Sequence, residues 1–282
     1  MALKSNPLFG EGRNLIDISI ERIKFAFESA EARGKDSLYV AFSGGKDSIV
    51  IAHLCKLAAI PYTLNYNITG IDPPELIYFM RKYYPELIWH KNDKTMWQLL
   101  EEKGTPPLPR SRYCCSELKE RGGEDEFCVT GVRWAESNNR KNNREAFENF
   151  GVNKSEKMMF NDNDEGRRQF EICQMKRKFI INPIIDWTAE DVWEFIHHFN
   201  LPYCKLYDEG YDRIGCIGCP LKSVRLRKQD FIKYPKFERL YLRAFDKMIA
   251  NRQLKGMKCT WKDGKDVMRW WLKETKKEGG LF

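Results

Sequence analysis

The sequence predicts an α/β fold, a mostly parallel sheet with helices on both faces, followed by a helical appendage at the C-terminus. Three observations support this prediction. Strand-like and helix-like segments alternate four or five times, a glycine turn joins the first strand to the next helix, and beyond Pro202 a loop leads into helices. Alternating strands and helices favour a parallel sheet, whose ligands bind at the carboxyl ends of the strands.

The first half of this pattern is regular. Hydrophobic periodicity predicts a helix over 14–33 that ends before Gly34, and then a strand over 37–43 and a helix over 47–59. A second strand is expected over 62–67. Asp72 can cap a helix that begins with Pro73 and Pro74 and runs to Tyr83.

The second half adds three strands around a polar stretch. We expect a strand over 87–91, a helix over 95–104, and a strand over 126–132. The segment 138–170 is rich in Asn and charge and predicts an insertion or a mobile loop. A further strand is expected over 179–185, and Thr188 caps the helix that follows, with Asp191 at its third position.

Length and composition limit the class of protein. The chain has 282 residues, of which 42% are hydrophobic and 31% charged, as in a folded protein. No apolar run approaches the ~20 residues that span a membrane, and the N-terminus has no apolar export signal. We therefore expect a cytoplasmic protein whose nine cysteines are thiols or metal ligands. Secreted miniproteins, membrane proteins and fibrous repeats are excluded.

The charge is unevenly distributed. Residues 222–282 contain 18 Lys and Arg against 7 Asp and Glu, whereas residues 1–221 contain 30 against 33. We therefore expect a main domain over 1–221 and a basic helical extension over 222–282. The extension is either a solvated helical surface or the contact surface for an acidic partner.

Aromatic residues in the extension point to nucleic acid as that partner. Trp270 and Trp271 are either core residues or a stacking platform for bases. They are surrounded by Lys265, Arg269, Lys273, Lys276 and Lys277.

The decapeptide AFSGGKDSIV, residues 41–50, predicts an anion site. Its strand ends at Phe42, its glycines allow backbone N–H groups to converge, and the following helix contributes a positive N-terminus. The residues expected to hold phosphate are Ser43, Gly44, Gly45, Lys46, Asp47 and Ser48. The spacing differs from that of a Walker P-loop and from GxGxxG.

Five of the cysteines occur in patterns typical of metal ligands. Cys114 and Cys115 are adjacent, Cys216 and Cys219 form a CxxC pair, and Cys204 precedes Cys216 by 12 residues. Zinc and iron–sulfur clusters both take four thiolates, so the spacing alone leaves both open.

These motifs together resemble a known family. SGGKDS is similar to the PP-loop of N-type ATP pyrophosphatases, which cleave ATP between its α- and β-phosphates. RYCCSELK, GVRWAESNNR, INPIIDWTAEDVW and LPYCKLYDEGYDRIGCIGCP follow in order and resemble the sulfonucleotide reductase family, also called phosphoadenosine phosphosulfate (PAPS) reductase-like. The resemblance covers about residues 37–221. It implies an adenine nucleotide alpha hydrolase-like fold and is greatest for the DNA-phosphorothioation members.

The resemblance also implies ligands and roles. It implies a [4Fe–4S] cluster on Cys114, Cys216 and Cys219, with either Cys115 or Cys204 as the fourth ligand. ATP and Mg²⁺ are the other expected cofactors, since Mg²⁺ takes one or two carboxylates plus phosphate oxygens. Beside the loop residues we expect Asp72 to contact nucleotide. The candidate catalytic residues are Lys46, Asp47, Arg133, Glu136 and Arg140.

One departure from the family separates the candidate functions. Its true reductases end in a tail with an ECGxH-like motif, whereas this sequence ends in KEGGLF and has no histidine beyond its last cysteine, Cys259. We therefore expect an ATP pyrophosphatase that adenylylates nucleic acid for sulfur incorporation, as in DNA phosphorothioation. A cysteine desulfurase or another sulfur donor would be its partner. The alternatives are a tRNA thiolase, a PAPS or adenylyl sulfate (APS) reductase, and a nucleotide-binding regulatory module.

Overall fold

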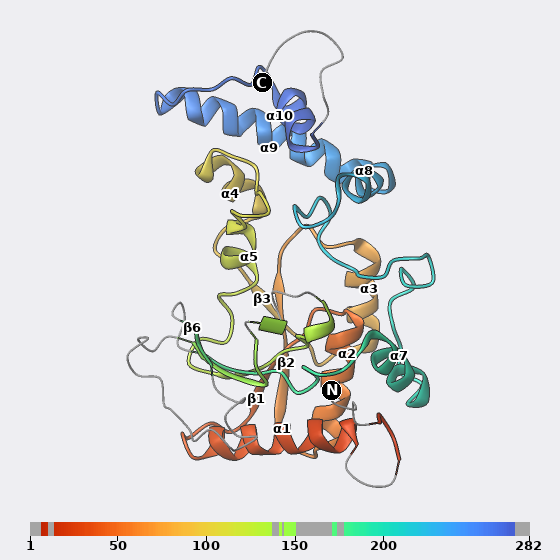
Figure 1. The fold of residues 1–282 in the computed structure, drawn as a ribbon. Helices are drawn as coiled ribbons and strands as arrows, with labels where there is room; N and C mark the ends of the chain where they lie inside the picture. Colours follow the sequence, from red (N-terminus) through yellow and green to blue (C-terminus); the bar gives the residue numbers. More distant parts are fainter. Residues whose placement is uncertain are drawn as a thin grey trace. The chain divides into compact units, whose positions relative to one another are not determined.

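A computed structural model describes residues 7–10, 14–136, 141–142, 144–150, 171–173 and 178–273. The chain divides into two compact units (Figure 1). Unit 1 comprises residues 1–66, 75–90 and 122–214. Unit 2 comprises residues 67–74, 91–121 and 215–282.

A twisted sheet forms the centre of unit 1, in the order β3-β2-β1-β4-β7-β5-β6. Strand β1 pairs in parallel with β2 and β4, and β4 pairs in parallel with β7, so the predicted α/β fold is confirmed. The five strands from β3 to β7 in this order are β3 Ile88–Lys91, β2 Tyr62–Ile68, β1 Leu38–Ala41, β4 Phe127–Val129 and β7 Lys178–Ile181.

The helices of unit 1 begin where the sequence predicts. Asn14 caps α1 by accepting from the backbone N–H of Asp17, and Thr188 and Asp191 form a reciprocal capping box on α7. The four helices are α1 Leu15–Glu31, α2 Lys46–Leu57, α3 Pro74–Tyr83 and α7 Ala189–His198.

The core of unit 1 forms where these helices pack apolar side chains against the strands. Leu38 and Val40 of β1 are fully buried together with Ile23 of α1 and Leu54 of α2. Trp187, also fully buried, satisfies its indole N–H by donating to Ser19 Oγ at 3.1 Å. A buried indole without such a partner would lose a hydrogen bond that water supplies to the unfolded chain.

Three short elements depart from the sequence prediction. The expected insertion 138–170 contains strand β5, Phe147–Phe150, which pairs antiparallel with β7. Strand β6, Glu171–Cys173, extends the sheet beyond β5. Helix α5, Tyr113–Leu118, was not expected. Residues 151–170 of the expected insertion lie outside the described residues.

Unit 2 is helical and centres on α9, Pro235–Leu254. Helices α4 and α10 pack against α9, and Figure 1 shows α8, α9 and α10 gathered at the C-terminal end of the chain. The other helices are α4 Met96–Lys103, α5, α8 Val224–Lys233 and α10 Gly264–Trp271. Among the described residues no helix is both long and apolar enough to cross a bilayer.

The division into units differs from the boundary expected after residue 221. The apolar face of α9, including Tyr241 and Phe245, shares one core with Leu99 and Leu100 of α4. Hydrogen bonds reinforce this packing: Asn251 Nδ2 donates to the Glu101 carbonyl at 2.7 Å. Helices α4 and α5 therefore belong with the C-terminal helices, although they lie more than a hundred residues earlier in the sequence.

The two tryptophans of α10 differ in their exposure, which decides between the core and the stacking interpretation for Trp271. Trp271 is 3% exposed and donates from its indole to the Pro107 carbonyl at 2.8 Å, so it is a core residue and no stacking platform. Trp270 is 46% exposed and remains accessible to a base. Adjacent helical residues point about 100° apart, which is why one ring enters the core and the other does not. Lys276 and Lys277 lie outside the described residues.

Candidate functional site

The glycine turn after β1 requires a residue without a side chain at position 44. Gly44 has a φ of 71°, which lies in the left-handed region. A Cβ built on Gly44 would lie 2.8 Å from Met80 Cγ and 2.9 Å from Leu76 Cδ1, both on α3. The chain therefore turns against α3 and enters α2 at once, with Gly45 as the N-cap residue.

The hydroxyls of the turn are held in place by the start of α2. Ser48 Oγ donates to the Gly45 carbonyl at 2.7 Å, and Ser43 Oγ lies 3.4 Å from Ser48 Oγ. The first turn of α2 also presents backbone N–H groups that have no partner within the helix, together with the positive end of the helix dipole. This arrangement is the one that proteins use to bind phosphate.

Lys46 is a buried cation at the start of α2. Its side chain is 8% exposed, and Nζ donates to the Asp212 carbonyl at 2.9 Å while lying 4.0 Å from Asp47 Oδ2. Burial lowers the pKa of Lys46, and the nearby Arg133 and Arg213 lower it further, against the opposing effect of Asp47. A phosphate oxygen in direct hydrogen-bond contact would favour the charged form of this ammonium more strongly than Asp47 does at 4.0 Å.

A buried ion pair connects α2 to the loop after β4. Arg133 Nε donates to Asp47 Oδ1 at 2.6 Å, and the arginine side chain is 4% exposed. A Cβ on Gly131 would lie 2.9 Å from Asp47 Cβ, so the two segments approach closely only because residue 131 is a glycine. Two of the predicted catalytic residues, Asp47 and Arg133, are thus in direct contact.

Glu136 extends this ion-pair network. The backbone N–H of Arg133 donates to Glu136 Oε2 at 3.4 Å, and Arg213 Nη1 lies 3.6 Å from Glu136 Oε1. Asp47 and Glu136 therefore each face a guanidinium, which is not the arrangement of a magnesium site. Arg140, the remaining predicted catalytic residue, lies outside the described residues.

Three participants were missed by the sequence analysis, namely Tyr207, Asp212 and Arg213. The hydroxyl of Tyr207 accepts from the backbone N–H of Lys46 at 2.9 Å, so it occupies one of the turn's donors. Its ring lies 5.5 Å from Lys46 Nζ. All three lie in the segment LYDEGYDRIG, whose spacing alone marks none of them as a site residue.

Asp72, expected to contact nucleotide, belongs to unit 2, whereas the turn belongs to unit 1. Thr69 Oγ1 donates to Asp72 Oδ2 at 2.8 Å, and Lys119 Nζ lies 3.7 Å from Asp72 Oδ1. Its carboxylate is 3% exposed. Both of these partners, Thr69 and Lys119, are residues of unit 2.

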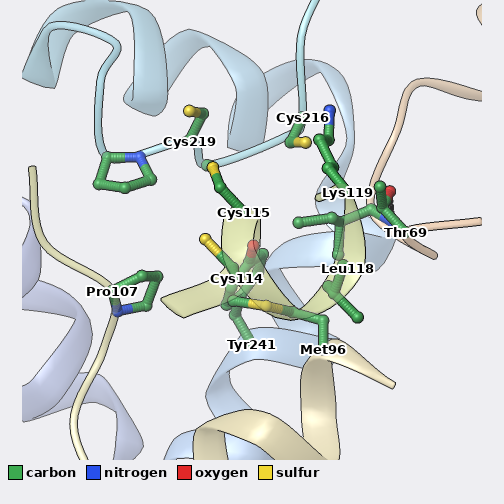
Figure 2. A pocket seen from close by; sticks show the side chains of 13 residues that line it. Thr69, Met96, Pro107, Cys114, Cys115, Leu118, Lys119, Cys216, Cys219 and Tyr241 are labelled. Atoms are coloured by element: carbon green, nitrogen blue, oxygen red, sulfur yellow. Dashed lines mark hydrogen bonds between the residues drawn. The ribbon is translucent and has the colours of Figure 1, made fainter. Parts of the chain in front are cut away.

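Four of the five candidate cysteines line one pocket of unit 2 (Figure 2). Cys114 and Cys115 come from α5, whereas Cys216 and Cys219 come from the loop before α8. In Figure 2 the thiols of Cys216 and Cys219 are drawn above those of Cys114 and Cys115, and Pro107, Met96 and Lys119 line the same pocket. The fifth, Cys204, is 1% exposed and belongs to the core of unit 1.

The paired cysteines have opposite acidities. A hydrogen bond from the Cys114 thiol lowers the pKa of Cys115 to about 6, against burial, and Arg112 and Lys119 assist. The same hydrogen bond, together with burial, raises the pKa of Cys114. Burial raises the pKa of Cys216 to about 12. Cys115 is therefore the readiest of these three to act as a thiolate.

A buried arginine interacts electrostatically with Cys219, one of the pocket residues. Arg227 is 5% exposed, its guanidinium lies 5.1 Å from the Trp271 ring centroid, and its Nε has no hydrogen-bond partner among the described residues. Burial lowers the pKa of Arg227, while the nearby Cys219 acts in the opposite direction. Such a cation stabilises negative charge on sulfur.

The chemistry of the donor set fits a thiolate-bound group. Four thiols on one pocket match the number that a cubane cluster or a zinc ion takes. Their present spacing is that of free cysteines, however, and in the described ranges no three or more His, Cys, Asp or Glu side chains are grouped to hold a metal ion.

Comparison with known families finds one match. Residues 37–222 match the phosphoadenosine phosphosulfate reductase domain. The matched range covers about two thirds of the chain and includes the glycine turn, the Asp47–Arg133 ion pair and all four pocket cysteines.

Curated relatives include both named and unnamed proteins. An adenosine 5'-phosphosulfate reductase of Oceanobacillus iheyensis is 29% identical over 67% of this chain and 73% of its own length. The corresponding reductase of Staphylococcus epidermidis is 28% identical over 71% and 75%. Two uncharacterized proteins of Methanocaldococcus jannaschii are 26% and 28% identical, and the chain spans only 40% and 46% of their lengths.

Solved structures give a weaker likeness. A PAPS reductase from Candida auris in complex with phosphate is 17% identical, covers 74% of this chain and 97% of its own, and has a TM-score of 0.45.

The first prediction tests the glycine turn as a phosphate site. Lys46→Ala removes a charge-assisted contact of about 1.5–3 kcal/mol, so ATP binding measured by calorimetry should weaken about tenfold or more. Lys35→Ala is the matched control, because Lys35 precedes β1 whereas the turn follows it, and its ammonium pairs with Glu126 at 2.9 Å. Unchanged ATP affinity in Lys46→Ala would rule out this site.

The second prediction concerns the tyrosine on the turn. Tyr207→Phe frees the Lys46 N–H for a phosphate oxygen, so ATP should bind about 2- to 10-fold more tightly, the worth of one net hydrogen bond. Tyr203→Phe is the control, because the Tyr203 hydroxyl donates to Asp208 at 3.1 Å and lies outside the turn. Weaker binding in Tyr207→Phe alone would mean that the hydroxyl contacts the nucleotide itself.

Proposed function

Since this chain belongs to the phosphoadenosine phosphosulfate reductase domain family, we propose that it is an ATP pyrophosphatase that adenylylates an acceptor for sulfur incorporation. The observation that carries the proposal is Lys46, a buried ammonium at a helix N-terminus beside the glycine turn. Such a site suits the polyphosphate of a nucleotide better than a neutral ligand, because backbone donors and a full charge act together.

The proposed reaction has two stages. An acceptor oxygen attacks the α-phosphorus of ATP, the bond between the α-phosphorus and the bridging oxygen breaks, and pyrophosphate leaves. A sulfur nucleophile then displaces AMP from the adenylylated acceptor. Negative charge grows on the pyrophosphate in the first stage, and fixed cations stabilise that charge without reorganising.

This chain supplies those cations from unit 1. Lys46 lies at the turn, and Arg133 and Arg213 are close enough to lower its pKa. Asp47 holds Arg133 in one orientation at 2.6 Å, and Glu136 lies 3.6 Å from Arg213. We assign the first stage to this group of residues. Mg²⁺ would arrive with the ATP phosphates. To bind this Mg²⁺, Asp47 would have to separate from Arg133, or Glu136 from Arg213.

Nucleic acid is the proposed acceptor. The excess positive charge of residues 222–282 supports this choice, since a phosphodiester chain is the commonest large polyanion in the cell. DNA backbone, as in phosphorothioation, is the first candidate and a tRNA base the second. The sulfur donor is proposed to be a cysteine desulfurase or a comparable persulfide source. Its terminal sulfur would displace AMP, and a thiol reductant of the cell would then cleave the remaining S–S bond and leave one sulfur on the acceptor.

The four pocket cysteines would hold a [4Fe–4S] cluster in this proposal. When bound, such a cluster supplies a site that carries sulfur or electrons. The chain's own residues orient it: α5 presents Cys114 and Cys115, and the CxxC loop presents Cys216 and Cys219. Arg227 adds a buried positive charge that offsets the thiolates.

A reductase is the second candidate, and the names of the relatives favour it. Two matched proteins are called adenosine 5'-phosphosulfate reductase. The same glycine turn would then hold an adenylyl sulfate, and a thiol would attack its sulfur. Cys259, the last cysteine of the sequence and a candidate for this thiol, is half-buried in the loop between α9 and α10, and its Sγ lies 3.7 Å from the Trp261 carbonyl oxygen.

The third prediction separates the two candidates. With ATP, Mg²⁺ and either DNA or tRNA, the protein should release pyrophosphate and form an AMP adduct, and Lys46→Ala should lose most of both. The measurements are coupled pyrophosphate detection and radiolabel transfer from α-labelled ATP. Sulfite release from adenylyl sulfate with a thiol reductant, without pyrophosphate from ATP, would overturn the proposal in favour of the reductase.

The fourth prediction concerns the cysteine pocket. Protein purified without oxygen should be brown and contain about four irons per chain. Serine variants of Cys114, Cys115, Cys216 and Cys219 should each lose iron and visible absorbance. Cys204→Ser is the matched control and should keep both, because Cys204 lies in the core of unit 1. A colourless protein with one zinc ion, or loss of iron in the Cys204 variant, would contradict the assignment.

A further inference from the structure

One face of α9 carries a row of cations. Lys236, Arg239, Arg243 and Lys247 are all exposed. Their spacing of three, four and four residues places them within a sector of about 80° around the helix axis. With a rise of about 1.5 Å per residue, the row is about 16 Å long. We call these four residues the α9 row.

The α9 row lies opposite the face that builds the core. The buried residues of α9 are Tyr241, Ala244, Phe245, Met248 and Ile249. At 100° per residue, their mean direction is about 165° from that of the row. Packing of α4 and α10 against α9 therefore fixes the direction in which the row points, and keeps it in solvent.

The charges of the α9 row have no ion-pair partner in the part of the chain that the structure describes. Within the described residues none of the four forms an ion pair, whereas Lys222 pairs with Asp230 at 2.7 Å and Arg269 with Asp266 at 3.5 Å. The nearest exposed carboxylate along α9, that of Asp246, accepts from the backbone N–H of Gly264 at 2.6 Å. Four neighbouring like charges repel one another, so a polyanion would relieve the repulsion.

A phosphodiester backbone has the matching charge spacing. One strand of B-form DNA carries a phosphate about every 3.4 Å along its axis, so about five phosphates fall within the length of the row. Lys and Arg side chains are long and flexible, so each can reach a phosphate even though the spacing of the phosphates differs from that of the four residues. Contacts of this kind position a nucleic acid without reading its sequence.

We propose that the α9 row is the surface on which unit 2 binds the phosphodiester backbone of a nucleic acid. The inference rests on the proposed function only in taking the acceptor to be nucleic acid. The proposed contact surface therefore differs from the one expected from the sequence, which included Trp270 and Trp271, because Trp271 is buried. DNA and RNA share the chemistry that the row recognises, and the experiment distinguishes them.

The test is fluorescence anisotropy of the full chain with labelled single-stranded DNA, duplex DNA and tRNA between 50 and 200 mM salt. Four phosphate contacts predict a log–log slope of about −3 to −4, which is a loss of affinity of about 100-fold over this range. The row variant Lys236→Gln, Arg239→Gln, Arg243→Gln and Lys247→Gln should bring the slope to between about 0 and −1. Its affinity at 50 mM salt should fall at least tenfold.

The matched control removes the same charge elsewhere in unit 2. Lys255→Gln, Lys258→Gln, Lys262→Gln and Lys265→Gln change four exposed lysines that are not on the α9 row. This variant should keep at least two thirds of the slope. Equal losses in the two variants would mean that diffuse charge, and no defined surface, binds the polymer, which would overturn the proposal.

Further outcomes keep this inference separate from the proposed function. Lys46→Ala should lose ATP binding and keep the salt slope, while the row variant should do the reverse, with unchanged circular dichroism showing that it is folded. Absence of binding below ~10 μM to all three nucleic acids overturns the α9 row even if pyrophosphate is released. Binding to vesicles of anionic phospholipid in place of nucleic acid also overturns it.

Discussion

The buried ion pair between Asp47 and Arg133 is the interaction on which the candidate site depends. It joins the first turn of α2 to the segment after β4, two parts of the chain that are 86 residues apart. Removing Asp47 would leave the buried Arg133 guanidinium without this partner, a loss of about 3–5 kcal/mol where both partners are fully buried and less here, because Asp47 is 21% exposed. Lys46 directly precedes Asp47 in the sequence, and Glu136 accepts from the backbone N–H of Arg133, so the pair also helps to place these two residues.

Local features of the sequence predicted local features of the structure. The turn SGGKDS carries its own conformational requirement, since Gly44 needs both a positive φ and the absence of a Cβ. The capping box of Thr188 and Asp191 likewise depends on residues three apart. Strand β5 was hidden because its pairing with β7 comes from residues about 30 positions away, and because its four residues lie within a segment, 138–170, that is rich in Asn and charge. Helix α5, with only six residues, has too few positions to show a period.

Residues that act over long distances were harder to predict. The cysteine pairs were recognisable from spacing, yet their meeting in one pocket depends on packing between α5 and a loop a hundred residues later. Tyr207 was missed because a hydroxyl that accepts one backbone N–H leaves no pattern. The sequence also could not tell which of Trp270 and Trp271 enters the core, because both lie beside basic residues and only the helix phase separates them.

The assembly of unit 2 from three stretches of chain has a topological consequence. Residues 67–74, 91–121 and 215–282 must meet before its core exists, so closing the long loop between them costs entropy that grows with the logarithm of its length. A polypeptide cut after residue 221 would leave Leu99 and Leu100 without the α9 side chains that cover them. The separated C-terminal helices would expose the complementary apolar face. The two fragments should therefore be insoluble when each is expressed alone, and should associate into a soluble complex when they are coexpressed.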